Sequence, residues 1–348
     1  MLRYEEIFTF DHLMQAHKVA RLGKRGNTEG IEFEADLLSN IANLHQRLMN
    51  GTYHQRNYYH FTIYDPKVRE IYALHYIDRI VQHCLCDNLL APWFDTHVIY
   101  DNAACRIGKG THFAMNRMDA FLHEHYKHYG TQGYILKCDI SKYFNNIDHE
   151  ILKGKLFRIF RDERVRSLLN DIIDSYEVTP GKGIPLGNQT SQWFAIWYID
   201  ELDRYVKEQR RIKHYTRYMD DFILIHPDKT YLMETLQGME AILKKLGLSF
   251  NSKTQVFPIN HGVEYLGWRF YLTDSGAVVR RLKKHSKIRW QHRLRKLKKM
   301  YAAGEIDIAK IKESIQSFAN HMSYGNTWKM HQKEMNRFVL RKNHTNNP

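Results

Sequence analysis

The sequence predicts an α+β fold, and three observations lead to that prediction. Residues 1–57 carry apolar side chains at helical spacing, residues 133–272 alternate between β-rich runs and helical segments, and the chain becomes strongly basic beyond residue 279. The chain has 348 residues, of which 43% are hydrophobic, which is enough for two or three packed subdomains. We expect the step in charge near residue 280 to mark a domain boundary.

The first 132 residues are expected to be mainly helical, with one pair of strands. Residues 58–74 alternate aromatic and aliphatic side chains around Asp65-Pro66, which predicts two short strands joined by a turn. Asn50-Gly51 ends the helix that precedes them, and a loop rich in small residues spans 101–110. The segments with helical periodicity are 36–48, 78–93 and 111–128.

The rest of the chain mixes strands with helices before it turns basic. Residues 134–140 form a β-rich run, and residues 215–226 form two apolar arms around Met219-Asp220-Asp221. A strand pair, or one strand with a bend, is predicted over 263–272. The predicted helices are 190–207, 229–246 and a basic amphipathic helix from residue 280, with Ile288, Trp290, Leu294 and Leu297 on its apolar face.

Charge and cysteine usage restrict the class of protein. A formal net charge of +14 favours nucleic acid as a partner over an anionic membrane surface. The longest uncharged apolar run, Trp193 to Ile199, is far shorter than the roughly 20 residues that cross a bilayer. Glu5 and Glu6 stand where a signal peptide has its apolar stretch. The four cysteines lack CxxC spacing, which fits a reducing compartment. We therefore expect a cytoplasmic protein with no membrane partner.

Two adjacent aspartates, Asp220 and Asp221, lie between the two apolar arms. Successive side chains of a strand point to opposite faces, so both aspartates can face one ligand only if the chain turns there. A tight hairpin with the aspartates at its tip meets this condition. The alternative is an ordinary solvent-exposed turn, where aspartate is common.

A third carboxylate, Asp139, lies near the end of the β-rich run 134–140. Two divalent cations about 4 Å apart are held by carboxylate oxygens that converge from more than one strand, and such a pair catalyses phosphoryl transfer. A nuclease uses the same carboxylates, so the aspartates predict the reaction class before its direction. A non-catalytic nucleic-acid-binding module would explain the charge but gives no reason for three convergent aspartates.

Several segments, in the same order, resemble those of reverse transcriptases. Tyr218-Met219-Asp220-Asp221 is similar to the Tyr-Xaa-Asp-Asp motif of that family. Asp139 to Phe144, with Ile147-Asp148-His149 after it, resembles the first catalytic motif of bacterial members. The other matching segments are 66–74, 183–192, 248–254 and Tyr265-Leu266-Gly267-Trp268. The resemblance extends over residues 58–275.

The resemblance implies a right-hand polymerase fold that carries out RNA-templated DNA synthesis. Its implied partners are a template RNA, a primer, the cDNA product and dNTPs. A basic thumb would contact mainly phosphate, so binding would depend strongly on salt. The implied parts are an N-terminal helical extension at 1–57, fingers at 58–132, a palm with an antiparallel sheet at 133–279 and a basic helical thumb at 280–348.

Within the family, the chain is most similar to the reverse transcriptases of diversity-generating retroelements. Ser191-Gln192 stands where retroviral enzymes and group II intron proteins have Ser-Pro, and residues 101–112 resemble the fingers segment of the retroelement enzymes. This implies that the protein copies a template repeat RNA with errors at template adenines, together with a small helical accessory protein. The alternative is an antiphage-defence or retron-like enzyme that works with its own noncoding RNA.

The resemblance also assigns catalytic roles. Asp139, Asp220 and Asp221, with the carbonyl of Ile140, would hold two Mg²⁺ ions, for which Mn²⁺ can substitute. Lys253 would protonate the departing pyrophosphate, and a plain surface lysine is the alternative for that position.

The remaining assignments concern the nucleotide and the nucleic acid. Lys67 and Arg69 would grip the incoming triphosphate, although a solvated turn explains them equally well. Phe144 would exclude the ribose 2′-hydroxyl by its shape, and Gln192, with Ile184, would take part in base selection. The residues expected to contact template or primer are Arg106, Lys109, Ile184, Gly267, Trp268, Arg280 and Lys284.

Overall fold

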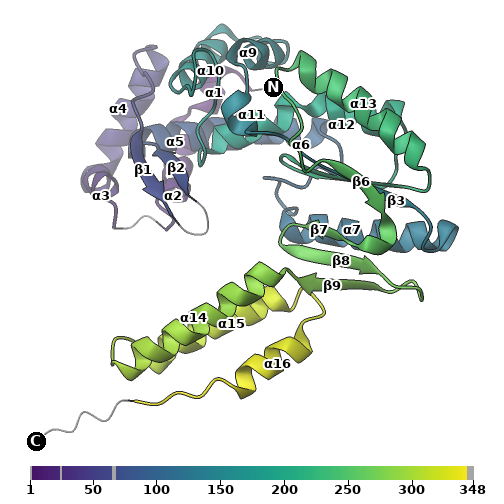
Figure 1. Ribbon diagram of the computed structural model, residues 1–348. Coiled ribbons are helices and arrows are strands. Elements are labelled where there is room, and N and C mark those ends of the chain that lie inside the picture. The colour runs from purple at the N-terminus through teal and green to yellow at the C-terminus, as the bar shows by residue number, and fades with distance from the viewer. Residues whose placement is uncertain (1, 24–25, 65–67, 343–348) are drawn as a thin grey trace, which may run out of the picture.

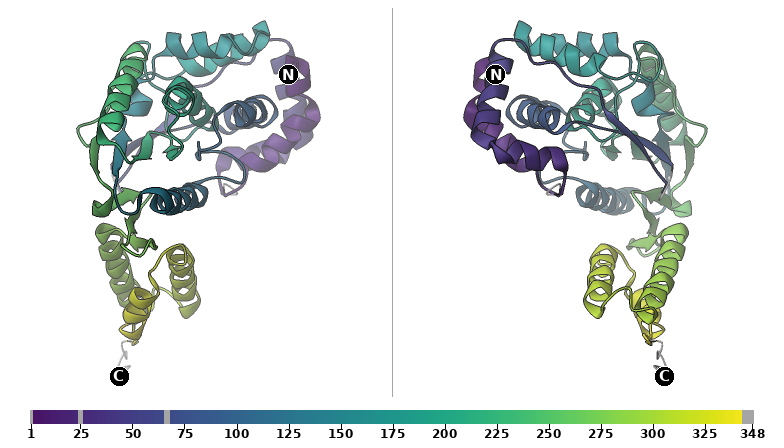
Figure 2. Two further views of the ribbon diagram at one scale, coloured as in Figure 1. Left: turned by 90° about the vertical axis from the view of Figure 1, so that its right-hand side faces the viewer. Right: turned by 90° about the vertical axis from the view of Figure 1, so that its left-hand side faces the viewer.

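The computed structural model describes residues 2–23, 26–64 and 68–342. Helices and three separate antiparallel sheets form an open arch, so the α+β prediction is confirmed (Figure 1). The N-terminal helices and a two-stranded hairpin form one side of the arch, a four-stranded sheet forms the other, and the C-terminal helices project below (Figures 1 and 2). No helix among the described residues is long and apolar enough to cross a membrane.

The N-terminal side is a helical cluster that carries a hairpin. Thr9 caps α2 by accepting a hydrogen bond from the backbone N–H of His12, and α4 buries Ile41, Leu44 and Leu48 on one face. The predicted strand pair is confirmed, with Phe61 opposite Ile71. The elements are α1 (Tyr4–Ile7), α2 (Phe10–Ala20), α3 (Thr28–Ala35), α4 (Leu37–Met49), β1 (Tyr59–Ile63), β2 (Arg69–Ala73), α5 (Tyr76–Leu85), η1 (Cys86–Leu90), α6 (Ala91–His97) and α7 (Thr111–Tyr129).

The four-stranded sheet has the order β4-β5-β3-β6, with every pair antiparallel. Successive residues of β3 point to opposite faces. Leu136 and Cys138 join the core that includes α13, and Ile135 joins the core that includes α7. The elements from β3 to β6 are β3 (Tyr134–Asp139), α8 (Tyr143–Asn146), α9 (His149–Phe157), α10 (Glu163–Asp174), α11 (Gln189–Tyr198), α12 (Asp200–Arg204), η2 (Tyr205–Gln209), β4 (Tyr215–Tyr218), β5 (Asp221–His226), α13 (Lys229–Lys245) and β6 (Gln255–Pro258).

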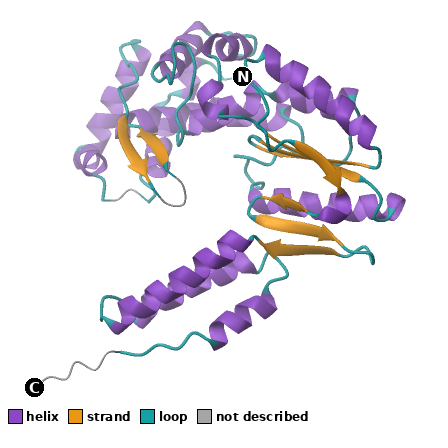
Figure 3. Ribbon diagram, viewed as in Figure 1, coloured by secondary structure: helices purple, strands orange, loops and turns teal. Residues whose placement is uncertain are grey.

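The C-terminal part begins with a three-stranded sheet and continues as helices (Figure 3). The predicted basic helix does not begin at residue 280, because residues 278–282 complete β9, and the helix starts at Lys284. Trp290 stacks on Phe318 with 3.8 Å between ring centroids, whereas Ile288 is exposed and is not part of the buried face. The elements are η3 (Ile259–His261), β7 (Val263–Tyr265), β8 (Trp268–Leu272), β9 (Val278–Leu282), α14 (Lys284–Ala302), α15 (Ile308–Met322) and α16 (Trp328–Asn336).

Two helices that the sequence predicts as continuous are interrupted. The helix predicted over 190–207 ends at Tyr198, where the next residue, Ile199, leaves helical geometry at φ −110° and ψ 20°. The helix predicted over 78–93 widens into a five-residue π-helical turn, Cys86–Leu90, just before Pro92. Proline has no N–H to donate to the preceding turn, so a local change in helix geometry is expected there.

Candidate active site

The catalytic hairpin, which we define as residues 215–226, joins β4 to β5 through a two-residue turn. Tyr218 pairs with Asp221, so Met219 and Asp220 alone form the tip. Met219 has φ +55°, a left-handed conformation that glycine, asparagine or aspartate usually supplies in such turns. The tight hairpin is confirmed, but Asp221 is already the first residue of β5 and not part of the tip.

Pairing of β3 with β5 brings the third aspartate to the same edge of the sheet. Asp139 lies directly opposite Asp221 in the antiparallel register, so their side chains project from the same face. Two like charges in this position repel each other. Asp139, Asp220 and Asp221 therefore lie together, as the sequence predicts.

Burial and mutual repulsion change the acidity of this group. Burial first, and then the charge of Asp139, raise the pKa of Asp220 above its usual range. Burial likewise raises the pKa of Asp221 to about 6, while the ammonium of Lys137 opposes the shift. Both carboxylates thus carry charge less readily than free aspartate does, unless a cation is close.

Two polar residues that the sequence reading missed contact the aspartates. The side-chain amide of Asn251 donates a hydrogen bond to Asp139 Oδ2, and its backbone N–H donates to the Asp139 carbonyl at 2.8 Å. Lys137 Nζ lies 3.6 Å from Asp221 Oδ1. Lys137 is two residues before Asp139 on the same strand, so the period of two indicates that both side chains share a face. No comparable signal points to Asn251.

The donor set fits divalent cations, although it is not gathered around one point. Within residues 2–23, 26–64 and 68–342, no three His, Cys, Asp or Glu side chains converge closely enough to hold one metal ion. Asp139 is turned onto Asn251. However, Asp221 Oδ1 is buried and accepts no hydrogen bond, and a buried carboxylate oxygen requires a partner. Hard cations such as Mg²⁺ prefer carboxylate oxygens of this kind.

Phe144 and Ile184 are joined to each other through their backbones. The backbone N–H of Ile184 donates to the Phe144 carbonyl at 2.9 Å, which ties the segment after Asp139 to the turn before α11. Phe144 is half-buried against the core, and Ile184 is buried with 3% of its surface exposed. The roles of Phe144 in excluding a 2′-hydroxyl and of Ile184 in base selection or nucleic-acid contact stay predictions.

Gln192 lines a cleft of about 380 Å³ between the β1–β2 hairpin, α5 and the start of α11. Its Oε1 accepts a hydrogen bond from Cys105 Sγ at 2.8 Å. Tyr72 and Leu186 form part of the same lining. The cleft is large enough for a nucleobase and places Gln192 at its wall.

Residues 54–270, more than half of the chain, match the family of reverse transcriptases (RNA-dependent DNA polymerases). The chain belongs to the reverse transcriptase family. Its fold is accordingly the right-hand polymerase fold, and the three aspartates lie at one edge of the four-stranded sheet. Enzymes of this family are RNA-directed DNA polymerases and generally use divalent metal ions, usually Mg²⁺.

Two other comparisons are more distant. The protein YkfC of Escherichia coli strain K12 is 22% identical in an alignment 309 residues long that covers 74% of this chain and 79% of YkfC. Among solved structures, the telomerase of Candida albicans in complex with a fragment of telomeric RNA shares 13% identity at a TM-score of 0.48. The apo telomerase of Candida tropicalis, truncated from its C-terminal domain, shares 15% at 0.49. The alignments cover 65% of this chain and 46% and 55% of those chains, so the chain spans about half their length.

Two basic residues near the β1–β2 turn are predicted to bind the triphosphate, and the structure describes only one of them. Arg69 is the first residue of β2, opposite Ile63, and is exposed. Lys67 lies outside the described residues. The triphosphate contact stays a prediction for both positions.

The two basic residues of the loop 101–110 are engaged within the protein. The Arg106 guanidinium is 7% exposed and donates to the Asp95 carboxylate and to the carbonyls of Asp95, Ile99 and Asn102. Lys109 donates to the Tyr100 carbonyl, and burial lowers the pKa of Lys109 to about 8. Through these contacts Arg106 and Lys109 stabilise the loop. Binding of nucleic acid by either residue stays a prediction.

The segment Leu266-Gly267-Trp268, predicted to contact the primer, forms a turn that is followed by a buried tryptophan. Leu266 and Gly267 have φ +47° and +89°, so two successive left-handed residues reverse the chain between β7 and β8. The Trp268 side chain is fully buried in the core shared with α7 and cannot reach a primer without unfolding that core. Of the two predicted contacts, only Gly267 is accessible, and only in part.

Arg280 and Lys284 have different surroundings. Arg280 is 12% exposed and donates to Asp119 and Asn116 of α7 and to the Tyr324 carbonyl, so it holds the C-terminal helices against α7. Lys284, the first residue of α14, is exposed. Lys253 is exposed beside Asn251, whose Oδ1 accepts its backbone N–H at 2.9 Å. The Ile140 side chain is buried, which leaves only its carbonyl as a candidate ligand.

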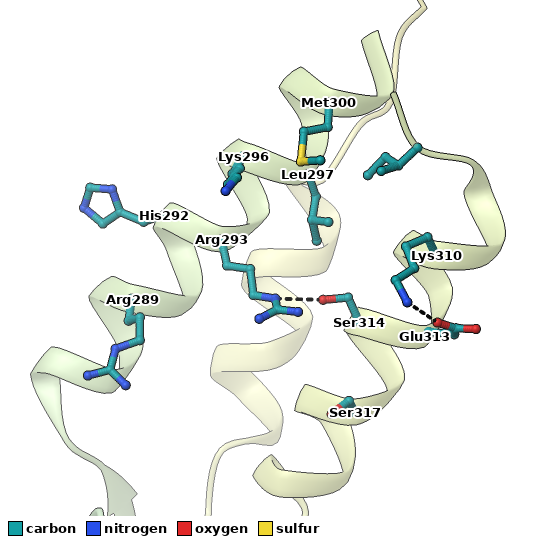
Figure 4. Close-up of a pocket in the computed structure, with 11 residues that line it drawn as sticks. Arg289, His292, Arg293, Lys296, Leu297, Met300, Lys310, Glu313, Ser314 and Ser317 are labelled. Carbon is teal, nitrogen blue, oxygen red and sulfur yellow. Dashed lines mark hydrogen bonds and ion pairs between the residues drawn. The ribbon is translucent and has the colours of Figure 1, made fainter. Parts of the chain in front are cut away.

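The C-terminal helices form a basic groove of about 710 Å³ between α14 and α15 (Figure 4). Arg293 spans the groove and donates to Ser314 Oγ at 2.9 Å, and Lys310 pairs with Glu313 at its far wall. The cationic side chains Arg289 and Lys296 project along α14 beside it. The positive face that the composition predicts is therefore concentrated on α14.

Removing the charge of Asp221 should stabilise the metal-free protein at alkaline pH. The pKa of Asp221 is raised above the usual 3.8, so the folded state disfavours the charged form. This penalty is fully present above pH about 6 and disappears below pH about 4, where the group is protonated in both states. Asp221→Asn should raise Tm in EDTA by about 2–4 °C at pH 8, which corresponds to about 1–2 kcal/mol.

The effect should fade at pH 4.5, as measured by calorimetry at both pH values. Glu305→Gln, an identical change of charge at an exposed loop position, serves as the control and should leave Tm unchanged. A Tm increase of equal size at both pH values would show that the charge of Asp221 is not its origin.

Proposed function

We propose that this protein joins dNTPs to the 3′ end of a primer on an RNA template by two-metal phosphoryl transfer. The observation that carries the proposal is the register of β3 and β5, which places Asp139 opposite Asp221, with Asp220 at the adjoining turn. This is a set of oxygen ligands from two strands, as a pair of divalent cations requires.

Bound divalent cations would lower the pKa of the primer hydroxyl and offset the charge of the departing pyrophosphate. Asp139, Asp220 and Asp221 would hold them, with the carbonyl of Ile140 as a further ligand. Phe144 would exclude a ribose 2′-hydroxyl by its shape. Lys253, exposed at the rim, would donate a proton to the pyrophosphate.

The surroundings of the aspartates favour a polymerase over a nuclease. A nuclease needs no second cleft, yet the Gln192 cleft lies between the hairpin β1–β2 and α11, where a template base and an incoming nucleotide can meet. A nuclease also gives no reason for an aromatic side chain at Phe144. A non-catalytic binding module would gain nothing from like charges paired across two buried strands.

Primer extension on an RNA template tests the proposal. Wild-type protein with Mg²⁺ and dNTPs should extend the primer, and Asp220→Asn with Asp221→Asn should reduce the rate at least about a hundredfold, because two carboxylate ligands lose their charge. Asp274→Asn with Glu305→Gln, two exposed carboxylates removed elsewhere, should extend normally. Template-dependent incorporation that survives the change at Asp220 and Asp221 would refute the site.

Phe144→Ala should allow ribonucleotides into the product. Removing the ring opens space beside the sugar, so the preference for dNTPs over NTPs should fall by about 10- to 100-fold, whereas dNTP incorporation continues. Competition between dNTPs and NTPs in the same extension assay measures the ratio. Phe157→Ala, an equal truncation on α9, is the matched control, and an unchanged ratio in Phe144→Ala would contradict the role.

Within the family, we infer a diversity-generating retroelement enzyme in which the protein copies a template repeat RNA, assisted by a small helical protein. The support is a contact between the two segments that resemble that branch. Cys105, in the loop 101–110, donates its thiol hydrogen to Gln192 of Ser191-Gln192. A proline at position 192 could not accept this hydrogen bond. An antiphage-defence or retron-like role with a dedicated noncoding RNA is the alternative.

Sequencing the RNA that copurifies with the protein distinguishes these roles. A retroelement enzyme should carry an RNA that contains a repeat matching a nearby variable gene, and its cDNA should differ from that repeat mainly at adenines. A structured noncoding RNA without such a match would favour the alternative. Copurification of a small helical protein from the same locus would support the accessory partner.

A further inference from the structure

The side chain of Arg217 is wholly buried beneath the catalytic hairpin. Its Nε donates to both carboxylate oxygens of Asp203 at 2.8 and 3.0 Å, and its Nη2 approaches Asp203 Oδ2 at 2.5 Å. Both side chains are 0% exposed. The hydroxyl of Tyr215 also donates to Asp203 Oδ1. Asp203 therefore serves as an internal anchor, on α12, for a residue of β4.

The Arg217 guanidinium also donates hydrogen bonds to two backbone carbonyls. Nη1 donates to the carbonyl of Met219 at 3.1 Å, and Nη2 donates to the carbonyl of Ile196 at 2.9 Å. Met219 is the residue held at φ +55° in the turn, and its carbonyl belongs to the peptide that leads into Asp220. Arg217 thus fixes the direction of the peptide from which the catalytic aspartates project.

The backbone of Arg217 is held as firmly as its side chain. Its N–H donates to the Asp101 carbonyl at 3.1 Å, and its carbonyl accepts from the Ala103 N–H at 2.9 Å. The loop 101–110 therefore pairs along β4 at this residue. The backbone from which the side chain starts is therefore held by the loop as well as by β5.

The stability of the fold does not by itself require a buried ion pair between Arg217 and Asp203. The pair lies among buried rings, including Phe222 and Tyr143, and well-packed apolar residues can replace such a buried pair with little loss of stability or with a gain. What apolar side chains cannot supply is a donor directed at the Met219 carbonyl. We propose that Arg217, anchored on Asp203, is a positioning residue that sets Asp220 and Asp221 for cation binding and catalysis.

The test separates stability from positioning by removing both charges together. Arg217→Met with Asp203→Leu and Tyr215→Phe leaves neither an unpaired buried charge nor an unpaired Tyr215 hydroxyl, so Tm should stay close to wild type. The donor to Met219 is lost, so the Kd for Mn²⁺ at the site should weaken, and kcat for primer extension should fall, each by about 10- to 100-fold. The KM for dNTP should change little, because the Gln192 cleft is untouched. Arg210→Met with Glu234→Leu, an Arg–carboxylate pair away from the hairpin, is the matched control.

If the variant that lacks both charges has a wild-type Tm and also a wild-type Mn²⁺ affinity and kcat, the proposal is wrong. Should that variant fail to fold, Arg217→Lys decides. Lysine keeps the charge beside Asp203 but cannot also reach the Met219 and Ile196 carbonyls, so a folded Arg217→Lys protein should show the same losses. A folded Arg217→Lys protein with wild-type values, or loss of fold in Arg217→Lys as well, would assign Arg217 to stability alone.

The inference rests on the proposed function, because that function identifies the site. Mn²⁺ binding and primer extension are measured separately, so failure of the inference can be distinguished from failure of the proposed function. Mn²⁺ binding, followed by calorimetry with the free protein, reports on the aspartates without any polymerisation. A wild-type protein that binds Mn²⁺ through Asp220 and Asp221 but extends no primer would refute the polymerase proposal, whereas the comparison with the Arg217 variants would still stand.

Discussion

The antiparallel pairing of β3 with β5 places Asp139 directly opposite Asp221, and two like charges at that position repel each other. The strands nevertheless pair over their whole length, because Leu136 and Leu224 are buried on one face of the sheet and Ile135 and Ile225 on the other. The hydrophobic core therefore holds the carboxylates in a position that they would not take by themselves. Lys137 and Asn251 relieve part of the repulsion, and a cation would relieve more.

This constraint explains why the strained turn and the buried ion pair lie in the same place. A turn with an ordinary residue at φ +55° is stored strain of about 1–3 kcal/mol, and it persists only where the surroundings determine it. Here the surroundings are the Arg217 guanidinium, the loop 101–110 and the helix end at Ile196. Arg217 of β4 thus joins the turn at Met219 to three segments distant in sequence, namely the loop 101–110, α11 at Ile196 and α12 at Asp203.

The sequence predicts a residue's place in the site well when that place depends on the local strand pattern. It predicts the place poorly when a partner distant in sequence decides it. The end position of Asp139 on its strand and the turn at Asp220 follow from the local sequence. Asp221 lies in β5 and not at the predicted tip, because its place opposite Asp139 depends on the pairing of β3 with β5. Arg280 is different, because its partner Asp119 lies 161 residues away and converts a residue read as a phosphate contact into an internal tie. Trp268 is buried for a similar reason, since α7 packs against its sheet. The helix boundaries at Ile199 and Lys284 also depend on tertiary packing, which local periodicity does not contain.

The loop 101–110 connects the two halves of the site. Its backbone pairs with Arg217 of the catalytic hairpin, and its Cys105 side chain binds Gln192 at the wall of the neighbouring cleft. The same short segment therefore contacts both the wall of the cleft, at Gln192, and the strand that leads into the turn at Asp220. The Ser191-Gln192 pair is consequently not an isolated marker in the sequence, because the glutamine has a partner in the same segment that supports the catalytic turn.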